Sequence, residues 1–436
     1  MPSGFFTPKT HDPVADDRNL PGSRLGRFAR LAALGVRSGA SMVLDRKGGS
    51  AAQHAAEVLG QLRGLAAKIG QMGSYVDGLV PEAQAEAFEA SLKILRAQAP
   101  RSSPAGIRAV VENELHAPIE ELFVQWEDVP IASASIGQVH RATLHDGREV
   151  AVKVQHPGIA RAVESDLANA QIIESFAGAL GGKRFNSRAL LDVIRARFRE
   201  ELDYVHEAES LQAFARLHAG DPTVRVPALV ESRSSARVLT TEMAHGASFE
   251  QACAATVTSR VAWAETMWRF VFKGTLVGGL LNADPHPGNY VFHDGGVVTF
   301  LDYGCTQPVR ERRKNAVRIH RAALAADERE FARCVAIAIS SKPGLLEDLA
   351  VAYTRQCFVP LFSSPYRLDK PFAASLVDGI REMALVARKL PDEEFFTMPP
   401  EMLFVNRLQF GFYSVLARLD VEVDYARVER AFIPDA

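Results

Sequence analysis

The sequence predicts an α+β fold with two lobes, a small lobe built on an antiparallel sheet and a larger lobe built mainly of helices. The chain has 436 residues, which is more than one hydrophobic core usually organises, so we expect two or three structural units. Strand patterns gather between residues 122 and 155, where His145-Asp146-Gly147 is typical of a hairpin turn. From about Ser248 onward the pattern is mainly helical.

Composition narrows the class of protein. Hydrophobic residues make up 47% of the chain and charged residues 23%, a balance that excludes domain-sized disorder and fibrous repeats. The 50 Lys and Arg residues nearly match the 52 Asp and Glu residues, which leaves a formal net charge of -2. This charge argues against a protein that coats nucleic acid, and we expect no nucleic acid partner.

Cysteines and apolar runs bear on the location of the protein. The four cysteines form no Cys-x-x-Cys pair, so neither a disulfide framework nor a structural zinc site is indicated, and a reducing compartment is expected. Residues 1–20 have no signal-peptide core, and we find no run of about 18 apolar residues elsewhere. We therefore expect a cytoplasmic protein without a transmembrane helix, either soluble or peripheral to a membrane.

Residues 1–47 are expected to form a polar arm followed by a basic amphipathic helix. Residues 22–47 hold six Lys and Arg residues against the single acid Asp45, interleaved with apolar residues such as Leu25 and Phe28. Such a helix can lie on an anionic membrane surface. It can equally pack on its own protein with its arginines in solvent. The pattern leaves both interpretations open.

Residues 48–120 are expected to form an N-terminal helical extension. Apolar residues from Val58 to Val76, spaced alternately by four and three, predict one amphipathic helix. Lys68 and Gln71 share a face beside this seam, and Gly70 lets another backbone approach closely. Taken alone, Lys68 and Gln71 have the pattern of surface residues. A further short helix is expected to end near His116.

Residues 121–247 are expected to form the small lobe, and residues 248–436 the large lobe. In the small lobe we predict strands over 123–129, 135–144, 149–155, 224–230 and 237–243, with helices over 159–180 and 187–217 inserted between them. In the large lobe we predict a loop at 282–289, short strands at 290–292 and 297–301, and helices over 310–324 and 403–419. The last of these carries polar residues and should pack on the large lobe.

Three short motifs carry the elements of phosphoryl-transfer chemistry. In the strand Val150-Ala151-Val152-Lys153, alternation buries the valines and projects Lys153 from the other face, where it can reach nucleotide phosphates. Asp284 and Asn289 lie five residues apart in a proline-rich loop, and Asp302 follows thirteen residues after Asn289. Phosphoryl transfer requires a cation for the phosphates, oxygen ligands for Mg²⁺ and a carboxylate near the acceptor. Each motif alone is weak, but their order and spacing make coincidence improbable.

With these motifs the chain, from about residue 55 onward, resembles the UbiB/AarF-type (ADCK-like) atypical kinases, a branch of the protein-kinase-like superfamily. The resemblance implies a bilobal protein-kinase-like fold with an added N-terminal helical extension. The matching stretches are Lys68-Ile69-Gly70-Gln71; an alanine-rich nucleotide loop of Ala132, Ser133, Ala134, Ser135, Ile136, Gly137, Gln138 and Val139; Val150 to Lys153; Glu201-Leu202-Asp203; the Asp284 loop; and Leu301 to Gly304.

The resemblance implies roles for these residues. Lys68, Gly70 and Gln71 are expected to lie across the mouth of the active site together with Glu201 and Asp203, in a cleft closed to bulky protein substrates. Asp284 is expected to orient or deprotonate the acceptor, and Asn289 and Asp302 to hold Mg²⁺.

Lys153 is expected to pair with a glutamate, and two candidates exist. Ordinary kinase spacing favours Glu174, whereas the family pattern favours Glu207. We favour Glu207, since the helical insertion between residues 155 and 217 belongs to the family.

Three residues depart from the family pattern. Ser133 replaces an alanine and puts the nucleotide preference in doubt. Asn282, where histidine is common, is treated as neutral, and Tyr303 is a conservative replacement of phenylalanine.

The leading hypothesis is a Mg²⁺-dependent enzyme that binds ATP (or ADP) and acts as an atypical kinase or ATPase. The resemblance implies a role in the synthesis of isoprenoid quinones or the handling of membrane lipids, with an isoprenoid lipid or quinone precursor as partner. No Ala-Pro-Glu string follows Asp302, so a docking platform for peptide substrates is unsupported. The alternative is a nucleotide-sensing protein in which ATP or ADP occupancy switches how a partner is engaged.

Overall fold

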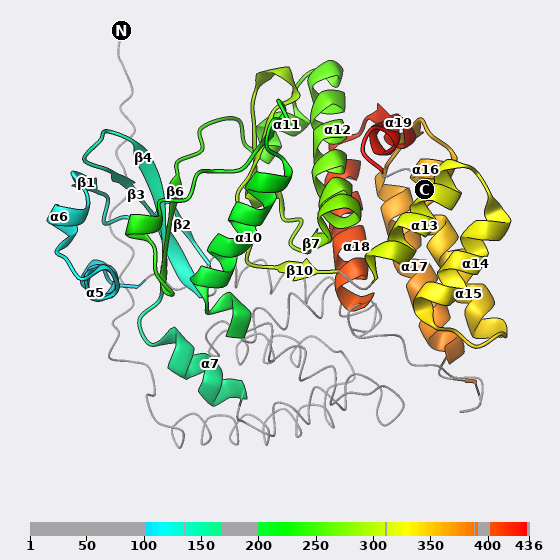
Figure 1. Cartoon of the computed structure of the whole chain (residues 1–436), viewed down its shortest axis with the longest axis horizontal. Coiled ribbons are helices and arrows are strands. Elements are labelled where there is room, and N and C mark those ends of the chain that lie inside the picture. Colours follow the sequence, from blue (N-terminus) through cyan, green and yellow to red (C-terminus); the bar gives the residue numbers. More distant parts are fainter. Residues whose placement is uncertain are drawn as a thin grey trace, which may run out of the picture.

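The structure is a computed structural model that describes residues 102–134, 136–167, 199–309, 312–387, 389–390 and 402–433. Figure 1 shows a small sheet-containing lobe beside a larger helical lobe, as the sequence predicts. Several predicted features lie outside the described residues. They are the arm and helix of residues 1–47, Lys68, Gly70, Gln71, Ser135 and Glu174.

The small lobe is built on a five-stranded antiparallel sheet. Its strands are β1 (Gln125–Trp126), β2 (Ala132–Ser133), β3 (Gly137–Thr143), β4 (Glu149–Gln155) and β6 (Val238–Glu242), in the order β1-β3-β4-β6 with β2 also paired to β3. The β3–β4 register places Val139 opposite Lys153. Gly147 takes a positive φ of 86° in the turn between these strands, which confirms the predicted hairpin and explains its glycine.

Helices cover this sheet. Helix α5 (Pro104–Leu115) buries Ile107 and Val111, and α6 (Ile119–Leu122) buries Ile119 and Leu122. These side chains share one apolar cluster with Val150, Val152 and Val154 of β4. Ser103 caps α5 by accepting a hydrogen bond from the Gly106 amide at 3.2 Å, and the helix ends at His116 with a positive φ of 56°. Helix α7 (Ile159–Leu167) follows β4.

Helix α10 (Tyr204–Leu217) corrects one prediction. The continuous helix expected over 187–217 is wrong, because the chain leaves the helical conformation at Leu202 and Asp203. The Asp203 carboxylate accepts a hydrogen bond from the Val205 amide at 3.0 Å and starts a new helix. A side chain that satisfies the first free amides fixes where a helix begins.

Two predicted strands are shorter than expected. The strand over 123–129 is reduced to Gln125–Trp126, since α6 extends to Leu122 and Pro130 has no amide hydrogen for the ladder. The strand over 224–230 is reduced to β5 (Val224–Arg225), because Pro227 interrupts it. β5 pairs in parallel with a large-lobe strand rather than with the small-lobe sheet.

Short paired strands follow the long helix α12 (Val257–Lys273). A π-helical turn (Gly274–Gly278) leads to β7 (Leu280–Asn282), which pairs with β10 (Thr306–Pro308). Between them in the chain, β8 (Tyr290–Phe292) and β9 (Val298–Phe300) form a hairpin, and β5 pairs with β9. The Asp284 loop thus joins β7 to β8, and the Asp302 turn joins β9 to β10.

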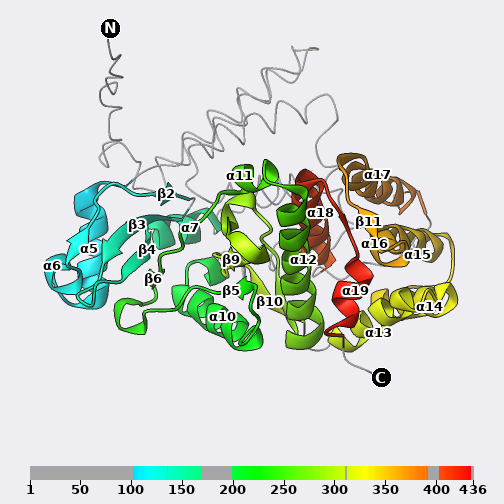
Figure 2. The ribbon, with the colours of Figure 1, turned by 90° about the horizontal axis from the view of Figure 1, so that it is seen from above.

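The remaining helices build the core of the large lobe around α12. They are α11 (Phe249–Cys253), α13 (Arg313–Leu324), α14 (Glu328–Ile339), α15 (Leu345–Cys357), α16 (Val359–Phe362), α17 (Lys370–Ala387), α18 (Met402–Leu419) and α19 (Tyr425–Arg430), with a small sheet of β11 (Tyr366–Arg367) and β12 (Glu422–Val423). Figure 2 shows α18 and α19 beside α12.

Helix α18 packs on the large lobe, as predicted for residues 403–419. Its Tyr413 ring stacks on Trp268 of α12 with 5.8 Å between centroids, and both side chains are buried. None of the helices in the described parts of the chain is long and apolar enough to cross a membrane.

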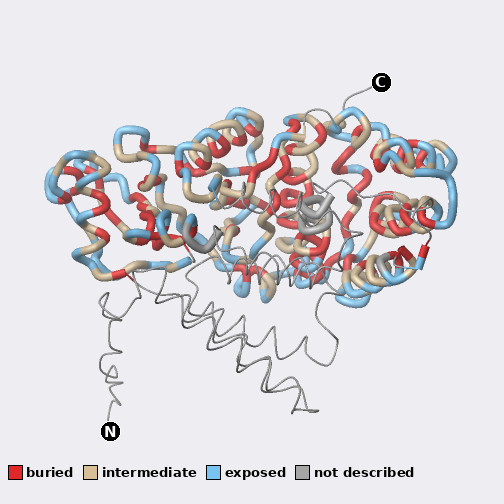
Figure 3. Tube along the Cα trace, turned by 90° about the horizontal axis from the view of Figure 1, so that it is seen from below, coloured by how far each residue is buried: buried red, intermediate tan, exposed pale blue. Residues whose placement is uncertain are grey.

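The lobes meet through an aromatic cluster on α10 and α12. Phe214 is fully buried, and its ring lies 5.0 Å from Phe270 and 5.4 Å from Tyr303. Phe270 in turn stacks on Phe300 at 3.6 Å. Figure 3 shows buried chain continuing from the small lobe into the large lobe. The cluster therefore holds α10 against the strands that carry the large-lobe loops.

We predict that Phe214→Ala destabilises the protein by about 3–5 kcal/mol, because a buried aromatic ring is replaced by a cavity. Urea unfolding followed by circular dichroism measures the loss. Val205→Ala on the same helix is the control, since Val205 is 47% exposed and should change stability little. Equal effects of the two substitutions would contradict the role of the cluster.

Candidate active site

Lys153 lies on β4 and forms an ion pair with Glu207 on α10. Val150, Val152 and Val154 are buried on one face of the strand, so Lys153 projects from the other face, as predicted. Its Nζ donates to both Oε1 and Oε2 of Glu207 at 2.8 Å. The expected pairing with Glu207 is thus present in the structure.

A second carboxylate approaches this pair. Asp302 Oδ2 lies 3.9 Å from Lys153 Nζ, and the Tyr204 ring lies beneath the ammonium with its centroid 5.0 Å away. Burial alone would lower the pKa of Lys153, but the carboxylates of Glu207 and Asp302 outweigh it and raise that pKa well above its ordinary value. Burial raises the pKa of Glu207, and the ammonium offsets part of this shift. The cation therefore stays charged between two acids.

The turn that carries Asp302 is held from several sides. Asp302 Oδ1 accepts a hydrogen bond from the Gly304 amide at 2.9 Å. The buried Tyr303 hydroxyl donates to the Phe300 carbonyl at 3.0 Å. A Cβ on Gly304 would lie 3.3 Å from Glu207 Oε2, so a larger residue would crowd the carboxylate that binds Lys153. The turn and α10 therefore pack closely at Gly304, and a larger residue would require the Glu207 carboxylate to shift.

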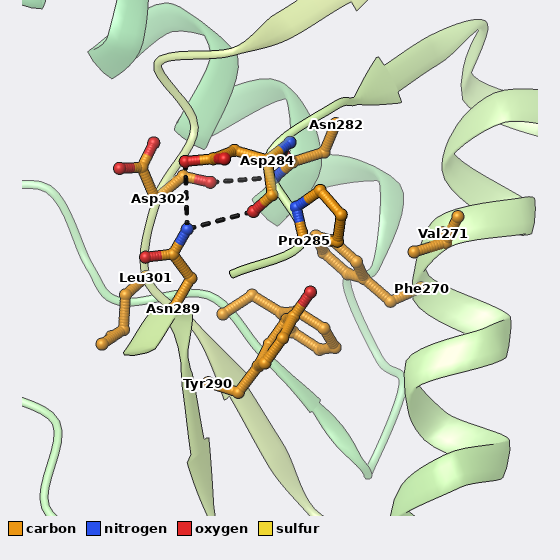
Figure 4. Close-up of a pocket in the computed structure, with 10 residues that line it drawn as sticks. Phe270, Val271, Asn282, Asp284, Pro285, Asn289, Tyr290, Leu301 and Asp302 are labelled. Carbon is orange, nitrogen blue, oxygen red and sulfur yellow. Dashed lines mark hydrogen bonds between the residues drawn. The ribbon is translucent and has the colours of Figure 1, made fainter. Parts of the chain in front are cut away.

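Asp284 and Asn289 come together at the two ends of their loop (Figure 4). Asn289 Nδ2 donates to the Asp284 carbonyl at 3.0 Å and lies 3.5 Å from Asp284 Oδ2. The Asn289 carbonyl accepts from the Leu301 amide at 3.0 Å, which joins this loop to the strand before Asp302. The loop therefore presents a carboxylate and a carboxamide beside the Asp302 turn.

Asn282 links the two loops and was missed by the sequence analysis, which treated it as neutral. Its Nδ2 donates to the Asp302 carbonyl at 2.8 Å. Its Oδ1 accepts from the Asp284 amide at 3.2 Å. A carboxamide supplies both a donor and an acceptor. The position of Asn282 two residues before Asp284, at the end of a strand, could therefore have indicated that it orients this loop.

The alanine-rich loop forms the edge of the small-lobe sheet. Ala132 and Ser133 lie in β2, the Ala134 amide donates to the Gly137 carbonyl at 2.8 Å, and Gly137 opens β3. A Cβ on Gly137 would lie 2.5 Å from the Val154 carbonyl oxygen and 2.7 Å from the Tyr204 hydroxyl. Gly137 is therefore required for the close approach of β3 to β4 and α10. Ile136, Gln138 and Val139 complete the described part of the loop.

A buried polar chain, also absent from the sequence predictions, holds this loop from behind. His156 Nε2 lies 3.1 Å from the Ala134 carbonyl and Nδ1 lies 2.9 Å from Ser102 Oγ. The Ser102 amide donates to Gln138 Oε1 at 3.0 Å, and Gln138 Nε2 lies 2.8 Å from His140 Nε2. These contacts fix the backbone of the loop to Ser102, which directly precedes the capping residue of α5.

Glu201 lies near the Asp302 turn, whereas Asp203 is placed at the start of α10. Cys305 Sγ donates to Glu201 Oε1 at 3.5 Å, and Asp203 caps α10. The expected closure of the cleft by Lys68, Gly70 and Gln71 stays a prediction, because these residues lie outside the described part of the chain.

The site offers oxygen ligands for Mg²⁺. Asn289 donates through its side-chain nitrogen, so its carboxamide oxygen can serve as a ligand. Asp302 Oδ2 lies 3.9 Å from Lys153 Nζ and offers a carboxylate oxygen. The described residues contain no cluster of three or more His, Cys, Asp or Glu side chains with metal-site geometry. Mg²⁺ typically binds one or two protein ligands plus substrate phosphates, and the donor set fits that mode.

Comparison with known proteins identifies similar chains. A family model described as the ABC1 atypical kinase-like domain matches residues 94–335. The atypical kinase COQ8B, mitochondrial, of Rattus norvegicus is 31% identical over 310 residues, which cover 67% of this chain and 58% of the relative. The atypical kinase coq-8, mitochondrial, of Caenorhabditis elegans is 26% identical over 442 residues, or 94% and 57% of the two chains. This chain thus spans somewhat more than half the length of these relatives.

A solved structure shares the fold. It is described as the complex structure of Rv3197-erythromycin from Mycobacterium tuberculosis and superimposes with a TM-score of 0.58. Its sequence is 23% identical, and the match covers 93% of this chain and 98% of that chain. This likeness supports the fold of the chain.

We predict that Lys153→Met destabilises the protein by about 3 kcal/mol near neutral pH, because it leaves Glu207 buried without its cation. The pKa of Glu207 is already raised by burial and should rise further. A group with a raised folded-state pKa stabilises the fold below its unfolded pKa and loses that contribution as pH rises through the folded pKa. The loss should therefore be larger at about pH 8 than at about pH 5, as measured by urea unfolding.

The double variant Lys153→Met with Glu207→Gln is the control for this experiment. It removes both charges, so part of the lost stability should return and the added pH dependence should vanish. A loss in Lys153→Met that is the same at both pH values would show that Glu207 does not depend on Lys153.

Proposed function

This chain belongs to the UbiB/AarF family of ABC1 atypical kinase-like proteins, and on that premise we propose that it binds ATP with Mg²⁺ and catalyses phosphoryl transfer or ATP hydrolysis. One observation carries the proposal. The Lys153–Glu207 ion pair, the Asp302 turn and the Asp284–Asn289 loop meet at one place between the lobes. This arrangement supplies the cation, oxygen ligands and acceptor-side carboxylate that the reaction requires.

Each residue has a role in the proposal. Glu207 and Tyr204 hold the Lys153 ammonium in place, so that it can neutralise nucleotide phosphates. Asn289 and Asp302 would hold Mg²⁺, which supplies further neutralisation of the phosphate charge. The alanine-rich loop presents backbone amides near its turn at Gly137, and such amides can face phosphate oxygens. Ser133 in this loop bears on the choice between ATP and ADP.

Asp284 is assigned to the acceptor side. Its amide is held by Asn282 and its carbonyl by Asn289, so the backbone that carries the carboxylate has little freedom. A fixed carboxylate at this point can orient an attacking hydroxyl or water and accept its proton. Asn282 is a positioning residue, because it ties Asp284 to the Asp302 turn.

The substrate is proposed to be small or lipid-like rather than a protein. Only residues 305–312 separate Gly304 from α13, which leaves little chain for a peptide-docking platform. Within the family premise we extend the proposal to isoprenoid quinone synthesis or membrane-lipid handling, with an isoprenoid lipid or quinone precursor as acceptor or ligand. An anionic membrane surface bound through residues 22–47 belongs to the same proposal.

We predict that Mg²⁺ with ATP or ADP raises the unfolding temperature of the wild type and that Asp302→Asn abolishes this shift. A ligand at about one hundred times its dissociation constant stabilises the folded protein by roughly 2.7 kcal/mol. Thermal unfolding with each nucleotide, with and without Mg²⁺, measures the effect. Asp294→Asn is the matched control, because Asp294 lies exposed in the β8–β9 turn and should leave the shift unchanged. A full shift in Asp302→Asn would refute the metal assignment.

We predict that Asp284→Asn retains nucleotide binding but lowers Mg-ATP turnover by about 10²–10⁴-fold, the usual contribution of a positioned general base. Single-turnover assays with purified protein measure the rate, and the thermal shift reports binding. Unchanged turnover would remove Asp284 from the reaction. Stoichiometric binding without any hydrolysis by the wild type would instead favour a nucleotide-sensing protein over an enzyme.

A further inference from the structure

A cavity of about 590 Å³ lies apart from the residues of the candidate active site. Its walls come from the C-terminal end of α10, residues 220–227, the segment 242–245 after β6, and the β8–β9 hairpin. Lys153, Glu207, Asp284, Asn289 and Asp302 do not line it. The volume falls within the range of small-molecule sites, about 300–1,000 Å³.

The cavity touches both lobes. Ala215 and His218 belong to the end of α10, whereas β5 pairs with β9 of the large lobe and brings Arg225 opposite Thr299. Residues 243–247 are the chain connection from β6 to the large lobe. A ligand here would therefore contact the junction between the lobes.

The acids that line the cavity already interact with cations. Asp221 Oδ2 lies 3.0 Å from Arg269 Nε, and its Oδ1 accepts from the amides of Thr223 and Val224. Glu242 lies close enough to Arg148 to contribute to the raised pKa of that guanidinium. His245 pairs with Glu149 at 2.6 Å.

Arg225 differs from the acids of the cavity because it has no partner of opposite charge among the described residues. It lines the cavity but forms no hydrogen bond or ion pair with other residues within the described ranges. Arg225 is exposed, so its positive charge is accessible to a ligand in the cavity.

Two histidines lie in the cavity wall. His218 is 3% exposed, and neither ring nitrogen has a hydrogen-bond partner among the described residues. Burial lowers its pKa to about 4, and the nearby Lys273 adds to the shift. Burial also lowers the pKa of His293; Arg225 adds to this shift, and the Asp294 carboxylate acts against it. Buried polar groups without partners are costly, and an anion nearby would offset the field of these cations.

Apolar side chains also contribute to the wall. They include Ala215, Val224, Val226, Pro227, Met243 and Ala244. A ligand whose charge lay at Arg225 would place its remaining atoms against these side chains. The wall therefore combines polar and charged groups with apolar side chains, so a ligand with both kinds of surface can contact it.

We propose that this cavity binds a small organic anion, a carboxylate or phosphate on a compact apolar body, with the anionic group at Arg225 and His293. Arg225 supplies a charge-assisted hydrogen-bond donor. His293 is held by its contact to Thr299 Oγ1 at 2.8 Å. The site is independent of the proposed nucleotide site, because the two share no lining residue among those named above.

Isothermal titration of the full chain with four probes tests this site. Benzoate and phenyl phosphate carry both an anionic head and an apolar body, inorganic phosphate carries the head alone, and benzyl alcohol carries the body alone. We expect benzoate or phenyl phosphate to bind with a dissociation constant on the order of millimolar, as ligands of this size allow. The tighter of the two identifies the head group. No saturable binding of either would overturn the proposal.

Arg225→Gln should weaken binding of the anionic probes by about tenfold or more, because a charge-assisted contact is lost. Arg225→Lys should retain most of the affinity. Arg216→Gln is the matched control, since Arg216 is exposed at the end of α10 but does not line the cavity. Equal affinities of Arg225→Gln and Arg216→Gln would overturn the assignment of the head group.

Two further readouts separate this site from other effects. In proton NMR spectra, benzoate should shift the His293 ring signals of the wild type and should not shift them in Arg225→Gln. Asp302→Asn should bind benzoate as the wild type does, so failure of the nucleotide site leaves this test intact. Inorganic phosphate that binds as tightly as phenyl phosphate would overturn the apolar part of the proposal.

Discussion

The ion pair between Lys153 and Glu207 is the interaction on which the arrangement of the site depends. Two carboxylate oxygens at 2.8 Å compensate the desolvation of one ammonium, and a buried charge is tolerated only with such partners. The pair joins β4 to α10, and α10 is placed by its Asp203 cap and by Phe214. Gly304 then brings the Asp302 turn against the same carboxylate. A change in any of these contacts would move the cation away from the large-lobe loops.

On the large-lobe side, backbone contacts position the functional groups. Asn282 binds the Asp302 carbonyl and the Asp284 amide, and Asn289 binds the Asp284 carbonyl. The pairings of β7 with β10 and of β8 with β9 bring the two loops together. Two short strand pairs and two carboxamides thus hold the two loops in one geometry, because an isolated pair of short strands is only marginally stable.

The sequence predicted well what depends on local pattern. Strand alternation located Lys153 on β4, and the His145-Asp146-Gly147 turn located its hairpin. The family resemblance, now confirmed, led to Glu207 rather than Glu174, which residue spacing alone would have favoured. Long-range polar contacts were not predictable in this way. Asn282 and the chain of Ser102, Gln138, His140 and His156 are unremarkable in sequence, because their partners come from other elements. The start of α10 was missed since one aspartate overrode a continuous helical pattern.

Helix α10 contributes residues both to the candidate active site and to the cavity lined by His218. Residues 207, 211, 214 and 218 repeat at spacings of four, three and four, so they follow one face of the helix. Glu207 at one end binds Lys153, Phe214 packs on Phe270, and His218, just after the helix, lines the cavity. Glu207 and His218 are separated by about 16 Å along the axis, at 1.5 Å per residue. The aromatic cluster at Phe214 lies between these two positions and fixes the helix to the large lobe. The cavity therefore adjoins the same helix that carries the partner of Lys153, although the two sites share no lining residue.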